Sequence, residues 1–234
     1  MIKLGILDSL WEMIFPTPRI CILCKKKQEQ IGICPACREK LAAYRQNHCR
    51  FSRCGTFGVT EENCPNHRKW PQYLKSNQSL WPYCGEYRKT LLEFKFKGQP
   101  WLAEALAKLM APLVTKGDII IPVPISAERL KERKFNQSAL LAKYLARETG
   151  LEYAENVLIK IKNTPRQSTL SYAERQKSLQ GALAVKNEQK IIGKDIILVD
   201  DICTTGATIL TCAQILHEQT KGDIYGITLC SGIQ

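Results

Sequence analysis

The sequence predicts an α/β protein in which a parallel sheet flanked by helices is preceded by a small zinc-binding domain. Two observations support this prediction. Eight of the 11 cysteines lie between Cys21 and Cys84, so potential metal ligands are concentrated in the front of the chain. Behind them, apolar runs alternate with amphipathic segments, as in parallel sheets with helical crossovers. We expect an N-terminal helix and zinc-finger domain over 1–75 and a sheet domain over 76–234.

The composition of the 234-residue chain is that of a folded protein with a basic front. Apolar residues make up 44% and charged residues 24% of the chain, which excludes wholesale disorder. The net charge is +12, and residues 1–98 contribute most of it, with 17 basic and 8 acidic residues. No uncharged apolar stretch reaches the roughly 18 residues of a membrane span, so none is expected.

The first 15 residues are mostly apolar but lack the features of an export signal. Asp8 and Glu12 interrupt them, and no small-residue cleavage site follows. The apolar side chains have helical spacing, which predicts a short amphipathic helix packed on the protein itself. These side chains are Leu7, Leu10, Trp11 and Ile14. Without an export signal, we expect a cytoplasmic protein.

Four cysteines follow at zinc spacing. Cys21-x2-Cys24 is separated by nine residues from Cys34-x2-Cys37. Each pair places two thiolates on one side of an ion, and Zn²⁺ takes four such ligands in a tetrahedron. Disulfides are the alternative, but they are disfavoured in a chain without an export signal because cytosolic thiols stay reduced.

A second, looser set repeats the nine-residue spacing. It consists of Cys49-x4-Cys54 followed by Cys64-x2-His67. Three thiolates and one imidazole also make a zinc site, so one or two zinc ions are expected. The alternatives are that some of these residues are free thiols, or that His48 replaces Cys49 as a ligand.

Basic residues and aromatic residues are interspersed around these cysteines. The basic ones are Arg19, Lys25, Lys26, Lys27, Arg38, Lys40, Arg45, Arg50 and Arg53, and the aromatic ones are Trp70, Tyr73, Trp81 and Tyr83. Positive charge and stacking rings suit single-stranded nucleic acid. The alternative is a solvated basic face with the aromatic residues packed beneath it.

The rear of the chain shows alternating strand and helix patterns. Continuous apolar runs such as 119–124 and 196–199 predict strands buried on both faces. Leucines at helical spacing in 101–114 predict a helix with one apolar face. The remaining expected elements are a helix over 136–148, strands over 157–161 and 182–185, a helix over 208–216 and a closing strand over 224–229.

The segment after the strand over 196–199 has the composition of a ligand loop. Asp200 and Asp201 end the strand, and adjacent carboxylates can accept hydrogen bonds from a ribose diol. Hydroxyls, backbone N–H groups and a helix start can then hold a phosphate. The residues that would do so are Thr204, Thr205, Gly206, Ala207 and Thr208. The segment is neither a Walker loop nor a dinucleotide fingerprint.

This segment resembles the phosphoribosyl pyrophosphate loop of type I phosphoribosyltransferases, and nearly the whole chain is similar to the ComF family of competence-associated proteins. The shared motifs include Phe15-Pro16, Tyr83, the run 93–98, Ile121-Pro122-Val123-Pro124, Arg129-Leu130-x2-Arg133, Phe135-Asn136-Gln137, Thr164-Pro165-x-Gln167, Leu170, Glu174-Arg175 and Gly181-Ala182. Lys134 stands where the family usually has glycine, and Ser178 and Leu183 also depart from its pattern.

The resemblance implies a type I phosphoribosyltransferase-like sheet and a role for each part of the site. Asp200 and Asp201 would take the ribose diol, with Mg²⁺, and the loop from Thr204 to Thr208 would take the 5′-phosphate. Arg129 and Arg133 would face the pyrophosphate. With the two aspartates they are the candidate catalytic residues, and 166–175 would form a mobile loop over the site.

Three functions are compatible with this pattern. The first is a phosphoribosyltransferase-fold protein that binds phosphoribosyl pyrophosphate or a related sugar phosphate and supports single-stranded DNA uptake beside a competence helicase, as the resemblance implies. The second is a metabolic phosphoribosyltransferase for a base or amine acceptor. The third is a non-catalytic phosphate-binding scaffold. No motif identifies the acceptor.

Overall fold

The structure is a computed structural model of the chain. It describes residues 18–46, 48–49, 56–57, 59–60, 62–64, 70–97, 100–162, 178–179 and 181–232. The expected N-terminal helix, two expected zinc ligands and the expected mobile loop lie outside this part of the chain. They are the residues up to Phe15, the side chains of Cys54 and His67, and residues 166–175.

Five parallel strands form the central sheet, in the order β1-β7-β6-β2-β3. Their bounds are β1 Leu74–Pro82, β2 Ile119–Pro122, β3 Glu152–Tyr153, β6 Ile196–Cys203 and β7 Ile224–Ser231. The predicted parallel sheet is therefore confirmed, with β6 at its centre. The predicted domain boundary, between residues 75 and 76, falls within β1.

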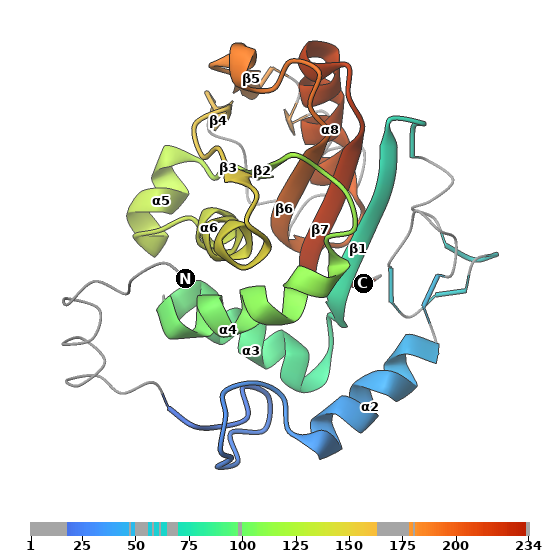
Figure 1. The fold of residues 1–234 in the computed structure, drawn as a ribbon, viewed down its shortest axis with the longest axis vertical. Coiled ribbons are helices and arrows are strands. Elements are labelled where there is room, and N and C mark those ends of the chain that lie inside the picture. Colours follow the sequence, from blue (N-terminus) through green and yellow to red (C-terminus); the bar gives the residue numbers. More distant parts are fainter. Residues whose placement is uncertain are drawn as a thin grey trace.

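Helices cover both faces of the sheet (Figure 1). On one face lie α3 Gly85–Lys97, α4 Pro100–Met110 with the short 3₁₀ helix η2 Ala111–Leu113, and α6 Gln137–Thr149; on the other lies α8 Ala207–Thr220. Alternate strand residues serve the two cores, because side chains of a strand point alternately to its two sides. Ile120 packs with the first group of helices, whereas Ile119 and Ile121 pack on the side of α8.

The front of the chain packs onto the same core as α3 and α4. Its helix α2, Pro35–Gln46, lies beside α3 (Figure 1). Ile22, Leu23 and Leu41 share one buried cluster with Leu91 and Phe94 of α3. The cysteine-rich turn therefore rests on a helix of the sheet domain.

Two predicted strands have a different role from the one expected. β4 Leu158–Lys160 and β5 Leu183–Val185 pair with each other, antiparallel, in a separate two-stranded sheet. Backbone bonds from Ile161 N to Ala182 O and from Lys186 N to Val157 O close this pair at both ends. The pair, called the β4–β5 hood below, packs against α8.

Two short helices complete the described chain. They are α5 Ala127–Arg133 and the 3₁₀ helix η4 Glu188–Lys190. Ser126 caps α5 by accepting a hydrogen bond from the backbone N–H of Arg129, as N-cap serines do. Among the described helices, none has the length and apolar character needed to span a membrane.

Candidate functional site

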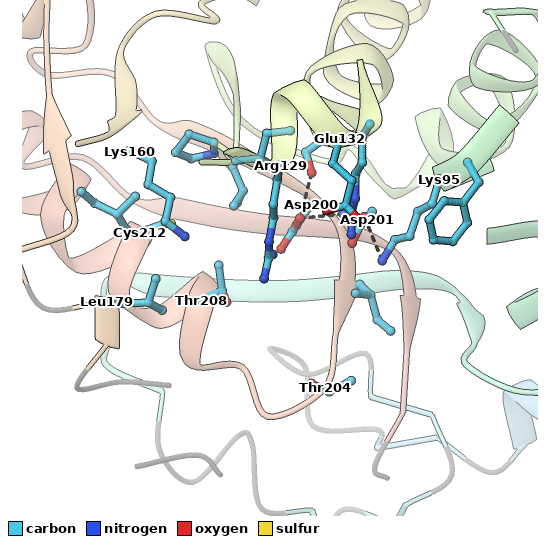
Figure 2. A pocket seen from close by; sticks show the side chains of 18 of the residues that line it. Lys95, Arg129, Glu132, Lys160, Leu179, Asp200, Asp201, Thr204, Thr208 and Cys212 are labelled. Atoms are coloured by element: carbon cyan, nitrogen blue, oxygen red, sulfur yellow. Dashed lines mark hydrogen bonds and ion pairs between the residues drawn. The ribbon is translucent and has the colours of Figure 1, made fainter. Parts of the chain in front are cut away.

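A cavity of about 340 Å³ opens at the carboxyl end of β6. Ligands of open α/β sheets bind at this end of the strands. Side chains from β6, α5, α6, α3 and the β4–β5 hood point into it (Figure 2). The polar ones are Tyr83, Lys95, Arg129, Glu132, Arg133, Ser138, Lys160, Asp200, Asp201, Thr204 and Thr208.

The two adjacent carboxylates lie on the floor of this cavity and are mostly buried. Asp200 Oδ1 accepts hydrogen bonds from Ser138 Oγ at 2.8 Å and from the backbone N of Asp201 at 2.8 Å. Asp201 Oδ2 lies 3.0 Å from Lys95 Nζ. Both carboxylates line the cavity, and each has a partner on a helix distant in the sequence.

Asp200 is harder to ionise than an ordinary aspartate. Burial is the main cause, and the charge of Asp201 adds to it; together they raise the pKa of Asp200 to about 7. The hydrogen bond from Ser138 and the charge of Lys95 act in the opposite direction. Asp200 therefore exchanges its proton near neutral pH.

The loop after β6 has the shape of an anion cradle. Gly206 has φ +76°, a left-handed conformation that glycine adopts at low cost, and it is the N-cap of α8. Residues 202–209 enclose a small hollow of about 20 Å³ next to the main cavity. Thr204 and Thr208 line both spaces. The positive end of α8, whose first N–H groups have no acceptor within the helix, suits a phosphate at this place.

The two predicted arginines face the cavity from α5. Arg129 and Arg133 both line it, and Arg133 Nη1 donates to Gln137 Oε1 at 3.1 Å. The short helix that carries them is not among the elements expected from the sequence. Lys134, in the position where the resembling family has glycine, ends that helix with φ +65°.

Some cavity residues have no predicted role, among them Ser138, Lys95 and Lys160. Ser138 and Lys95 bond to the aspartates, and Lys160 enters from the hood. Burial lowers the pKa of Lys160, and the nearby charge of Arg129 lowers it further. Lys95 lies within the shared run 93–98, a signal that could have found it. The sequence marks neither of the other two.

The first cysteine set forms a compact cluster at the front of the molecule. The four Sγ atoms of Cys21, Cys24, Cys34 and Cys37 all lie within 4.8 Å of one another. Those of Cys24 and Cys34 are 3.7 Å apart. A tetrahedral zinc with Zn–S distances of about 2.3 Å places its sulfurs at about this separation. The four thiols therefore fit a zinc site.

Backbone groups in this cluster favour a thiolate. Burial alone would raise the pKa of Cys21, but hydrogen bonds from the N–H groups of Cys34, Cys24 and Leu23 lower it to about 7. Burial and hydrogen bonds with the other three thiols raise the pKa of Cys37 to about 12. A bound divalent ion would deprotonate all four.

The second cysteine set is described only in part. Cys49 and Cys64 are buried in the core on the α8 side of the sheet, and Cys54 and His67 lie outside the described residues. His48, the alternative ligand, packs against Phe57 with ring centroids 6.0 Å apart. Within the described part of the chain, the four cysteines at the front are the one group close enough to share an ion. The second site stays a prediction.

The described basic residues beside the first four cysteines are exposed, but the described aromatic residues are mostly packed. Lys26, Lys27 and Lys40 are exposed. Trp70 and Trp81 are buried, and Tyr73 stacks on His217 with centroids 4.4 Å apart. Buried rings cannot stack on bases, so this surface offers charge rather than the interleaved aromatics that the sequence suggests.

Curated proteins with similar sequences cover most of the chain. Competence protein ComFC of Bacillus subtilis is 30% identical over 224 residues, which are 92% of this chain and 85% of that protein. Competence protein F of Haemophilus influenzae is 26% identical over 216 residues, 85% of this chain and 90% of that protein. No family model matches the chain.

Solved structures that resemble the chain match a smaller part of it, at lower sequence identity. The glutamine phosphoribosylpyrophosphate amidotransferase of Bacillus subtilis is 19% identical with a TM-score of 0.41, and the match covers 58% of this chain and 30% of that one. A hypoxanthine phosphoribosyltransferase from Staphylococcus aureus is 15% identical with a TM-score of 0.35, covering 56% of this chain and 72% of that one.

Proposed function

Because the chain belongs to the ComF family of competence proteins, we propose that it binds phosphoribosyl pyrophosphate, or a related phosphorylated pentose, in the cavity at the end of β6. We propose further that it acts in the cytoplasm on single-stranded DNA during natural transformation. The observation that supports the ligand most strongly is that two buried carboxylates and the loop before α8 line one cavity.

The chemistry of the two parts matches the two ends of a pentose 5-phosphate. Hydroxyl groups of the sugar would donate to Asp200 and Asp201, whose carboxylates accept such bonds. The 5′-phosphate would lie against the loop from Thr204 to Thr208, where backbone N–H groups and the α8 dipole favour an anion. Arg129 and Arg133, on the α5 side of the same cavity, would pair with a diphosphate.

Mg²⁺ fits this site only in part. Carboxylates are the oxygen donors that Mg²⁺ prefers, but Lys95 already pairs with Asp201. A diphosphate would have to supply the remaining oxygens. When bound with it, Mg²⁺ would neutralise charge on a departing pyrophosphate, and the arginines of α5 would hold that group in place.

The zinc cluster has a structural role in this proposal. Four thiol ligands leave no open position on a tetrahedral ion, which is the arrangement of structural rather than catalytic zinc. The exposed lysines around the cluster would attract the phosphates of DNA.

A thermal-shift experiment tests the proposed binding of a phosphorylated pentose. Ribose 5-phosphate and phosphoribosyl pyrophosphate with Mg²⁺ should raise the Tm of the wild-type protein. The double variant Asp200→Asn/Asp201→Asn should lose this protection, whereas Glu188→Gln, an exposed carboxylate elsewhere, should keep it. Equal protection in the double variant would refute the site. Release of pyrophosphate with a base or amine acceptor would instead favour a metabolic transferase.

A binding titration tests the proposed interaction with single-stranded DNA. Affinity for a single-stranded oligonucleotide should fall steeply with salt, since cations released from the strand drive such binding. Lys26→Glu/Lys27→Glu should weaken it, and Lys221→Glu, at the far end of α8, should not. Absent or salt-independent binding would contradict the DNA role and leave the sugar-phosphate site untouched.

A further inference from the structure

We infer that Lys95 is the positioning residue that makes the Asp200–Asp201 pair an acceptor for sugar hydroxyls rather than a site for a divalent cation. The inference rests on the proposed sugar-phosphate function and names how that site selects its ligand. A pentose phosphate then binds without metal, and Mg²⁺ enters only with a diphosphate.

The contacts of the two aspartates divide their oxygens into two kinds. Asp200 Oδ1 accepts from Ser138 and from the backbone N of Asp201, and Asp201 Oδ2 pairs with Lys95 Nζ at 3.0 Å (Figure 2). Among the contacts of the described residues, none joins a donor to Asp200 Oδ2 or Asp201 Oδ1. One oxygen of each carboxylate is thus committed, and one is left to accept from a ligand.

Both the side chain and the backbone of Lys95 have partners: its ammonium pairs with Asp201, and its carbonyl accepts from Gln137. The side chains of Lys95 and Asp201 are only 13% and 10% exposed, so water screens their attraction weakly. The carbonyl of Lys95 accepts from Gln137 Nε2 at 3.0 Å, and Gln137 is itself fully buried. The neighbouring Phe94 is buried in the main core. The backbone of Lys95 is therefore fixed, which holds the base of its side chain near Asp201.

Charge then decides between a metal ion and a hydroxyl group. Two ionised, adjacent carboxylates would carry −2 and attract a hard divalent cation. The ammonium of Lys95 reduces the negative charge of the group by one unit and repels a second cation at close range. A hydroxyl group is neutral, so it is not repelled, and it gains a charge-assisted hydrogen bond. The site therefore discriminates in favour of a vicinal diol.

Calorimetric titration of the full-length protein tests this inference. The buffer is freed of divalent cations by a resin, without a soluble chelator, so that zinc at the cysteines is not removed. Wild-type protein should bind ribose 5-phosphate in this buffer and should show no binding of Mg²⁺ alone. Lys95→Met keeps the length of the side chain but removes its charge; it should bind ribose 5-phosphate at least tenfold more weakly and gain binding of Mg²⁺. Lys95→Arg should restore the wild-type pattern.

Lys89→Met is the matched control, because Lys89 lies on the same helix but pairs with Glu86 in solvent; it should behave as wild type. If Lys95→Met bound ribose 5-phosphate as tightly as wild type, or if wild type bound Mg²⁺ alone, the inference would be overturned. The wild-type Mg²⁺ titration decides this even if Lys95→Met fails to fold. Ribose 5-phosphate binding that requires Mg²⁺ would overturn the inference but not the proposed function. If ribose 5-phosphate did not bind either with or without Mg²⁺, both the inference and the proposed function would be overturned.

Discussion

Lys25 Nζ lies 2.5 Å from Glu93 Oε2, which joins the turn after Cys24 to the helix that ends at the ligand cavity. The same ammonium donates to the carbonyl of Ile22 at 3.0 Å, and Thr90 Oγ1 on α3 donates to that carbonyl at 3.2 Å. The helix α3 therefore contacts the cysteine cluster along one part and Asp201 near its end. We expect the metal centre and the cavity to depend on each other.

Zinc at the four cysteines should stabilise the protein and its ligand site together. Elemental analysis should find at least one zinc per chain. Cys24→Ser should lower the Tm by on the order of 10 °C, because a structural zinc contributes folding free energy directly. It should also weaken binding of ribose 5-phosphate. Cys84→Ser, outside the cluster, should keep zinc and binding. Zinc-free protein with full stability would contradict this role.

The raised pKa of Asp200 predicts a pH dependence of stability. The folded pKa is about 7 and the ordinary value 3.8, with burial as the main cause. The native state thus holds this proton more tightly than the unfolded state, so the free energy of unfolding falls as pH rises between those values. Asp200→Asn has no carboxyl group at this position, so it does not lose this stability as pH rises. Its stability relative to wild type should rise by on the order of a few kcal/mol between pH 4 and pH 8.

Urea denaturation of both proteins at the two pH values measures this difference, since titrating groups that do not interact with Asp200 cancel in the comparison. Glu188→Gln supplies the control, because its side chain is exposed. A difference between Asp200→Asn and wild type that does not change with pH would mean that Asp200 is ionised normally in the folded protein.

Arg129 should distinguish a diphosphate from a monophosphate. Arg129→Met should weaken binding of phosphoribosyl pyrophosphate with Mg²⁺ by about tenfold, which is the loss of one charge-assisted contact of about 1.4 kcal/mol. Ribose 5-phosphate lacks the diphosphate and should be affected less than twofold. Lys131→Met, exposed on the same helix, controls for net charge. Equal losses of affinity for both ligands would mean that Arg129 does not contact the diphosphate specifically.

Lys134 should be replaceable by glycine with a gain in stability. It ends α5 with φ +65°, where a side chain costs roughly 1 kcal/mol. Lys134→Gly should stabilise by about 0.5 kcal/mol, after the entropy of the unfolded chain is counted. Lys131→Gly, within the helix, should instead destabilise by about 1 kcal/mol. Chemical denaturation measures both, and a loss of stability in Lys134→Gly would show that its side chain makes a compensating contact.

The sequence predicts those elements whose residues are buried on both sides. β2 and the start of β6 are continuous apolar runs, β7 is largely apolar, and α6 and α8 each bury one apolar face. β1 is not predicted because its buried residues include Asn77 and Ser79; Ser79 is accommodated by a 2.6 Å hydrogen bond with Thr228. α5 is missed because none of its residues is buried, and Leu130 is 45% exposed.

Some residues of the candidate site could likewise be predicted from the sequence, and others could not. Asp200, Asp201 and the threonine loop are contiguous, so their pattern is visible in the sequence. Ser138 and Asp200 are 62 positions apart, and Lys95 and Lys160 come from elements whose placement depends on the tertiary fold. The pairing of β4 with β5 in a separate sheet, which brings Lys160 to the cavity, follows from long-range packing that residue periodicity does not encode.

A crystal structure of the protein with phosphoribosyl pyrophosphate and Mg²⁺ tests the central claim most directly. We expect density for the ligand in the cavity, with the 5′-phosphate within hydrogen-bonding distance of the N–H groups of 205–208 and the sugar hydroxyls against Asp200 and Asp201. A cavity that stays empty at saturating ligand, or a ligand bound elsewhere with these aspartates untouched, would contradict the account.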